Sequence, residues 1–97
     1  MSGPVMPRRR RRLVNGGERA ELARRYGFTP GSSGAVNCHY CEAEGHATWF
    51  FSERSKVGWF ATTLEIDHVV PLASGGTYEP SNLVIACRYC NRSKGCR

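Results

Sequence analysis

Side chains suited to hydrolytic chemistry gather in the stretch 65–94, EIDHVVPLASGGTYEPSNLVIACRYCNRSK. An acid and a histidine are neighbours there, at Asp67 and His68, and an asparagine follows at Asn91. Carboxylate and amide oxygens suit a hard divalent ion such as Mg²⁺ or Mn²⁺. A neutral imidazole can take a proton from water near neutral pH. The stretch therefore predicts a hydrolytic site in which Asp67 and Asn91 hold a metal ion and His68 is the general base.

The cysteines offer a second, softer set of ligands. Four of the five cysteines fall into two C-x-x-C pairs, Cys38–Cys41 and Cys87–Cys90, and Cys96 is left over. Such short loops let both thiolates of a pair reach one tetrahedral ion, so two pairs predict a four-thiolate Zn²⁺ site. The odd count and the lack of an apolar leader disfavour a secreted disulfide framework. A cytoplasmic, reducing setting is expected instead.

Two strands and a helix are expected to carry the hydrolytic residues. In order, the pattern predicts a strand at 63–70, a loop at 72–81, a strand at 83–86 and a short helix from residue 88. Pro71 ends the first strand, because proline cannot donate to a sheet ladder. Neighbours in a regular strand face opposite sides, so Asp67 and His68 converge only where the strand ends or bends, which Pro71 allows.

The same stretch resembles the HNH endonucleases, the ββα-metal group of nucleases. The residues that carry the resemblance are Glu65-Ile66-Asp67-His68-Val69-Val70-Pro71, Gly75-Gly76, Asn82-Leu83 and Cys87-x-x-Cys90-Asn91-x-x-Lys94. Thirteen residues lie between His68 and Asn82, and eight between Asn82 and Asn91, as is usual for such sites. The resemblance is strong over the last third of the chain, extends weakly to the first cysteine pair and does not cover the N-terminal arm. Asn91 stands where the family often has histidine, and active members with asparagine there are known.

The resemblance implies an α+β fold, namely a small zinc-stapled ββα-metal domain, and hydrolysis of DNA phosphodiester bonds by nicking or double-strand cleavage. It assigns His68 as the general base, with the catalytic Mg²⁺ or Mn²⁺ at Asp67 and Asn91. It also implies that Asn82 holds the loop so that His68 is correctly aimed. Small stand-alone members occur in phages and prophages, so a partner in packaging or recombination is a further expectation.

Charge is divided unevenly along the chain. Residues 1–27 hold eight arginines against two glutamates, a net charge of +6, whereas residues 28–97 hold six basic and six acidic side chains. A nucleic-acid backbone would therefore be attracted mainly by the N-terminal arm. The expected nucleic-acid contacts are Arg8, Arg9, Arg10, Arg11, Arg12, Arg24 and Arg25 in the arm, and Arg92 and Lys94 beside the hydrolytic residues.

The basic arm is expected to be partly helical and separate from the rest. Prolines and five consecutive arginines predict disorder at its start. Asn15 and Glu18 match a capping box, and Gly27 matches a helix stop. The expected parts are a disordered 1–12, a short helix at about 15–27, a Gly- and Ser-rich linker at 28–36 that ends the arm (1–36), and a nuclease domain at 37–97.

Two aromatic runs, Trp49-Phe50-Phe51 and Trp59-Phe60, flank a polar stretch and predict a β-hairpin within 42–64. We expect these rings to form the core of a small domain, and base stacking is the alternative.

Two other functions stay open at this point. One is a zinc-knuckle nucleic-acid-binding module with an inactive site, although a binder does not need Asp67, His68 and Asn91. The other is an accessory protein whose nuclease needs a partner for activity. Nothing in the sequence approaches membrane-spanning length, so no membrane association is expected. The oligomeric state, on which cutting one strand or two depends, is not fixed by the sequence.

Overall fold

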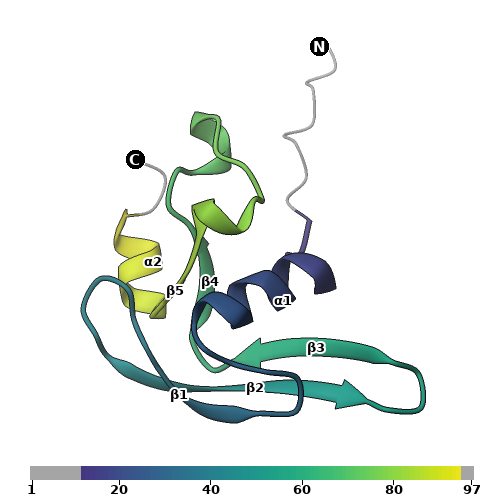
Figure 1. Cartoon of the computed structure of the whole chain (residues 1–97). Helices are drawn as coiled ribbons and strands as arrows, with labels where there is room; N and C mark the ends of the chain where they lie inside the picture. Colours follow the sequence, from purple (N-terminus) through teal and green to yellow (C-terminus); the bar gives the residue numbers. More distant parts are fainter. Residues whose placement is uncertain (1–11, 95–97) are drawn as a thin grey trace.

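The computed structural model describes residues 12–94, with the side chain of Lys94 excepted (Figure 1). Disorder was expected over 1–12. Residues 1–11, which include Arg8 to Arg11, lie outside the described range, as does Cys96, whereas Arg12 is described and bonds the Glu18 carboxylate. The elements in order are α1 (Gly16–Arg25), β1 (Ser33–Asn37), β2 (Glu44–Ser52), β3 (Val57–Thr62), β4 (Glu65–His68), η1 (Leu72–Ser74), η2 (Pro80–Asn82), β5 (Leu83–Ala86) and α2 (Arg88–Lys94). Short helices and two antiparallel sheets confirm the α+β fold class. Within 12–94, no helix combines the length and apolar character needed to cross a bilayer.

The first sheet has three antiparallel strands in the order β1-β2-β3. The expected aromatic hairpin is confirmed as β2 and β3, in which Trp49 pairs with Phe60 and Phe50 pairs with Trp59. Alternation sends the first pair into the core, where both rings are buried, and leaves Phe50 60% and Trp59 40% exposed. The core interpretation therefore holds for one aromatic pair and not for the other.

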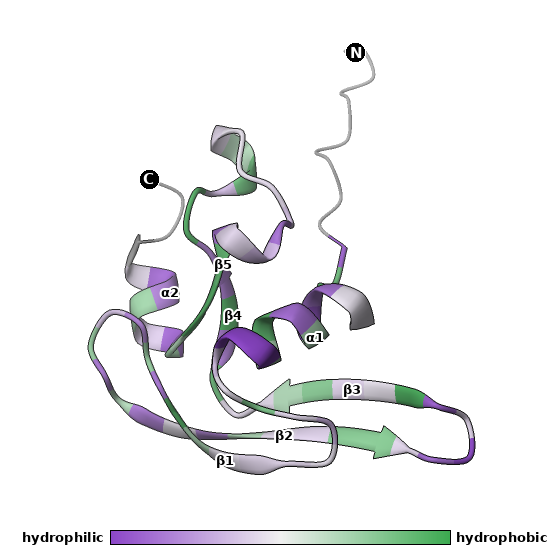
Figure 2. Ribbon diagram, in the orientation of Figure 1, coloured by the Kyte–Doolittle hydropathy of each residue, from purple (hydrophilic) through white to green (hydrophobic). Residues whose placement is uncertain are grey.

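The second sheet is the hairpin of β4 and β5, followed directly by α2, which packs against β4 (Figure 1). This is the expected ββα order. All four residues of β5 are buried, and the strand is hydrophobic along most of its length (Figure 2). β4 is shorter than the expected strand at 63–70 at both ends, because Thr63 and Leu64 form a bend before it and Val69 and Val70 belong to the loop that follows.

Helix α1 begins at the predicted capping box. The Asn15 side chain accepts from the Glu18 amide at 2.9 Å, and the Asn15 amide donates to the Glu18 carboxylate at 3.0 Å. Leu22 and Ala23 are fully buried against the sheet. Gly27 follows the helix with φ of 85°, a left-handed conformation that favours glycine.

The linker expected at 28–36 is wrong. Ser33–Asn37 forms β1, which pairs with β2 over its whole length. Phe28 is buried, with its ring edge-to-face against Phe60 at 5.2 Å. Small residues suggested a linker, but an edge strand needs only backbone pairing, and Phe28 and Val36 supply the buried contacts. One core joins both sides of the boundary drawn at residue 36: Val14, Leu22, Ala23, Phe28, Val36, Ala47, Trp49, Phe60, Leu83 and Ile85.

Candidate active site and metal centre

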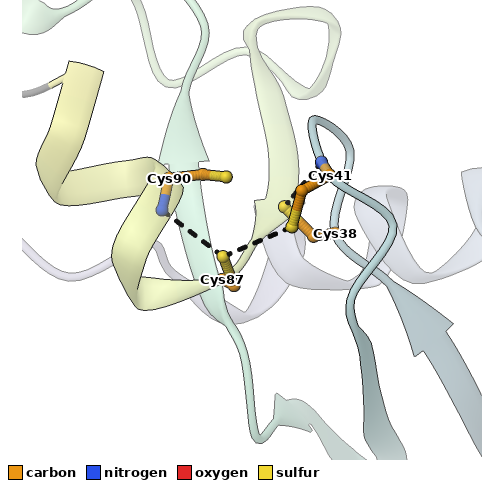
Figure 3. Close-up of side chains that lie close together, drawn as sticks. All are labelled: Cys38, Cys41, Cys87 and Cys90. Atoms are coloured by element: carbon orange, nitrogen blue, oxygen red, sulfur yellow. Dashed lines mark hydrogen bonds between the residues drawn. The ribbon is translucent and has the colours of Figure 1, made fainter.

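The four paired cysteines meet between the two sheets (Figure 3). One pair lies in the turn after β1, and the other spans the end of β5 and the first turn of α2. All four sulfur atoms lie within 4.8 Å of one another, and those of Cys41 and Cys87 are 3.7 Å apart. Zinc–sulfur bonds of about 2.3 Å at tetrahedral angles place the sulfurs about 3.8 Å apart. The cluster is therefore positioned to bind a metal ion such as zinc.

Backbone amides donate hydrogen bonds to sulfur atoms of the cluster and so favour their thiolate form. The amides of Tyr40 and Cys41 donate to the Cys38 sulfur at 3.4 and 3.5 Å, and the Cys90 amide donates to the Cys87 sulfur at 3.3 Å. Burial raises the pKa of Cys38, but backbone hydrogen bonds outweigh it and lower that pKa to about 6. Contact with the Cys87 sulfur raises the pKa of Cys90 to about 12. Thiolates this close oppose one another's ionisation, and a bound cation removes that opposition.

His68 is the last residue of β4, and it is buried, with 6% of its surface exposed. Its ring packs edge-to-face on the Tyr78 ring, with the centroids 4.8 Å apart. Tyr78 comes from the loop between η1 and η2. The candidate base therefore lies where β4 ends and the loop begins, in a largely dry environment.

Asn82 ties that loop to the end of β4. Its Oδ1 accepts from the Val70 amide at 2.8 Å, and its Nδ2 donates to the carbonyls of Val70 and Thr77 at 3.0 and 2.9 Å. Its own carbonyl accepts from the Val69 amide at 2.8 Å. The loop also needs Gly76, where a Cβ would collide with the Val70 carbonyl. These bonds hold the segment that directly follows His68.

Asp67 is also 6% exposed, and its Oδ2 accepts a hydrogen bond from the Tyr40 hydroxyl at 3.1 Å. Alternation along β4 places Asp67 and Glu65 on one face and His68 on the other. Asn91, on α2, donates from Nδ2 to the Glu65 carboxylate at 2.7 Å. This bond occupies the amide nitrogen, so Oδ1 is the atom that Asn91 could offer to an ion.

Tyr40, Glu65 and Tyr78 also belong to the site; Glu65 stands in the motif named from the sequence, whereas the two tyrosines were not identified from it. Each contacts a candidate site residue: Asp67, Asn91 and His68, respectively. For Glu65 a signal existed, because it precedes Asp67 by two positions and so shares its strand face. For the two tyrosines the sequence carried no comparable signal.

The candidate nucleic-acid contacts have varied surroundings. Arg12 forms a two-bond pair with Glu18 at 2.9 and 2.7 Å, and its guanidinium lies 3.7 Å from the Tyr78 ring centre. The hydrogen bond from Arg12 is the main reason that the pKa of Glu18 is lowered. Arg24 lies over the Trp49 ring and Arg25 donates to the Pro80 carbonyl, yet both remain exposed, as does Arg92.

Comparison with known proteins gives a match to one family. The family model described as HNH endonuclease matches residues 38–97, which is more than half of the chain. The match begins at the first cysteine of the metal cluster and includes both strands and the helix of the ββα unit. No curated protein and no solved structure matches the chain significantly. The chain belongs to the HNH endonuclease family.

Proposed function

We propose that the protein is a metal-dependent endonuclease that hydrolyses DNA phosphodiester bonds, with a structural zinc ion at the four cysteines. The observation that carries this proposal is the ββα unit, in which Asp67 and His68 end one strand, Asn82 secures the following loop and Asn91 faces β4 from the helix. Family membership supports action on nucleic acid.

In this proposal His68 removes a proton from the attacking water. The water oxygen forms a bond to phosphorus, the bond from phosphorus to the 3′-oxygen breaks, and a 5′-phosphate and a 3′-hydroxyl result once the leaving oxygen is protonated. Burial beside Tyr78 limits the rotamers open to the imidazole. A base held in one orientation needs little reorganisation to reach the transition state.

The donor set of Asp67 and Asn91 fits a hard divalent ion. Asp67 offers a carboxylate oxygen and Asn91 offers an amide oxygen, and these are ligands typical of Mg²⁺ and Mn²⁺ rather than of zinc. When bound, the ion would supply charge stabilisation for the phosphate and the leaving oxygen. The hard oxygen ligands thus favour Mg²⁺ or Mn²⁺ at the catalytic site, and the soft thiolates favour zinc at the structural site.

Nicking of supercoiled plasmid by the zinc-loaded protein, with and without Mg²⁺ or Mn²⁺, tests the proposal. We expect cleavage that depends on the added ion. Binding of DNA without cleavage of DNA or RNA under any of these conditions would instead support a zinc-knuckle binding module.

Two substitutions of Asn82 should reduce the cleavage rate to different extents. Asn82→Ala removes all three side-chain hydrogen bonds of the loop, whereas Asn82→Asp keeps the acceptor for the Val70 amide and loses the two donors. At about 1 kcal/mol for each net hydrogen bond, Asn82→Ala should lower the unfolding free energy by about 3 kcal/mol. We expect cleavage rates in the order wild type, Asn82→Asp, Asn82→Ala, measured alongside zinc content and thermal unfolding. Equal rates for all three would contradict a loop-holding role, and Ser81→Ala, at the exposed neighbour, is the control.

The arm is tested by deleting residues 1–11, which removes Arg8 to Arg11 and keeps the Arg12 contacts. Each lost phosphate contact should lower the slope of log affinity against log salt by about 0.9 on duplex DNA. We expect weaker binding and a flatter slope in fluorescence-anisotropy titrations, with zinc content and thermal unfolding unchanged. Arg54→Ala, on the exposed β2–β3 turn, removes positive charge elsewhere and should leave the slope nearly as it was. An unchanged slope after the deletion would show that residues 1–11 do not contact DNA.

A further inference from the structure

Tyr40 connects the two metal sites. It lies between Cys38 and Cys41 in the first cysteine loop, and its hydroxyl donates to Oδ2 of Asp67, 27 residues further along the chain, at 3.1 Å. The same loop donates its Tyr40 amide to the Cys38 sulfur. Tyr40 therefore contacts Asp67, the candidate ligand of the catalytic ion. Tyr40 also belongs to the cysteine loop that the structural metal ion would hold.

The position of Tyr40 is fixed from both sides of its loop. The His39 amide donates to the Ile85 carbonyl of β5 at 2.8 Å, which joins the loop to the second sheet. The Glu42 amide donates to the Cys38 carbonyl at 2.9 Å and closes the turn. A phenol on a loop held in this way can meet a buried carboxylate at a repeatable distance.

A donor at one carboxylate oxygen limits rotation of the Asp67 side chain. The phenol bonds Oδ2, so this hydrogen bond orients the carboxylate that Asp67 would offer to an ion. The phenol is the donor in this bond, because a tyrosine with an ordinary pKa of about 10 keeps its proton at neutral pH. Hydrogen-bonded neighbours of metal ligands commonly change metal affinity by about 10–100-fold.

We infer that Tyr40 is a positioning residue for Asp67, and that through it the four-cysteine centre sets the affinity of the catalytic ion site. The inference rests on the proposed function, because it takes Asp67 as a ligand of the catalytic ion. It adds a role for the structural metal beyond holding the fold, namely control of how strongly the second ion binds.

Tyr40→Phe tests this inference because it removes a single oxygen atom. In zinc-loaded protein, we expect zinc stoichiometry and thermal unfolding to stay near wild type, and Mn²⁺ affinity by isothermal titration calorimetry to fall by about 10–100-fold. In plasmid nicking, the Mn²⁺ concentration needed for half-maximal rate should rise, with most of the maximal rate recovered at saturation. Tyr89→Phe, at an exposed tyrosine on α2, makes the same chemical change away from Asp67 and should leave both values unchanged.

Three outcomes would overturn the inference in distinguishable ways. Wild-type Mn²⁺ affinity in Tyr40→Phe would show that the phenol does not position Asp67. Reduced thermal stability with unchanged Mn²⁺ affinity would show a purely structural hydrogen bond. Equal Mn²⁺ binding by wild type and Asp67→Ala would show that the ion does not use Asp67, and in that case the proposed metal site itself is wrong.

Discussion

Replacing His68 by alanine is expected to reduce DNA cleavage by about 10²–10⁴-fold, because general-base catalysis contributes on that order. Zinc content and DNA affinity should be retained. His68 is buried against Tyr78, so alanine also leaves a cavity and should lower stability. His68→Gln keeps most of the volume and cannot accept the proton, so it should lose the same activity with a smaller change in thermal unfolding. Single-turnover nicking at saturating protein measures the effect.

Comparing the His68 variants with variants of the candidate metal ligands distinguishes loss of the base from loss of the ion. Asp67→Ala and Asn91→Ala should lose activity through the ion, so raised Mn²⁺ should partly restore them and should not restore either His68 variant. His46→Ala is the matched control, because His46 is also on a strand but is exposed on β2. Cleavage at the wild-type rate by His68→Gln would show that another group is the base.

Replacing Cys87 by serine is expected to unfold the protein or to destabilise it strongly. Apparent binding free energies for structural zinc are about 10–16 kcal/mol, comparable to the whole unfolding free energy of a typical domain, about 5–15 kcal/mol. The cluster joins the turn after β1 to α2, so the zinc-binding free energy contributes directly to the stability of the fold. Losing even part of this binding free energy should leave little net stability. Zinc stoichiometry and far-UV circular dichroism on heating measure the outcome.

Cys96→Ser supplies the control for that experiment. Cys96 belongs to neither C-x-x-C pair, so its replacement should leave zinc content and the melting temperature near wild type. A Cys87→Ser protein that is folded, zinc-free and as stable as wild type would show that the metal does not hold the fold.

Local patterns in the sequence were sufficient for the parts of the fold that depend on short-range rules. The capping box at Asn15 and Glu18, the aromatic hairpin and the ββα order were all predictable, because each is set by residues close together in the chain. The cysteine cluster was also predictable, since metal chemistry restricts which residues can meet. The linker at 28–36 failed because the pairing of β1 with β2 and the burial of Phe28 are tertiary effects.

The contacts around the candidate site show the same limit. Tyr40 meets Asp67 across 27 positions, Asn91 meets Glu65 across 26, and Arg12 meets Tyr78 across 66. Composition and periodicity do not encode contacts at such separations. The identities of the candidate base and ligands could therefore be inferred from sequence, whereas the residues that hold them in place required the structure.

The hydrogen bonds of Arg12 limit how far from the candidate site the chain that precedes it can extend. The Arg12 amide and carbonyl each bond the Tyr78 hydroxyl at 3.2 Å, and the Tyr78 ring touches His68. A residue spans at most about 3.6 Å, so four residues can extend the chain by at most about 14 Å. This distance corresponds to about four base pairs of duplex rise at ~3.4 Å each. Under the proposed function, covalent geometry would therefore limit the DNA contacts of this run to phosphates within a few base pairs of the bond that is cleaved.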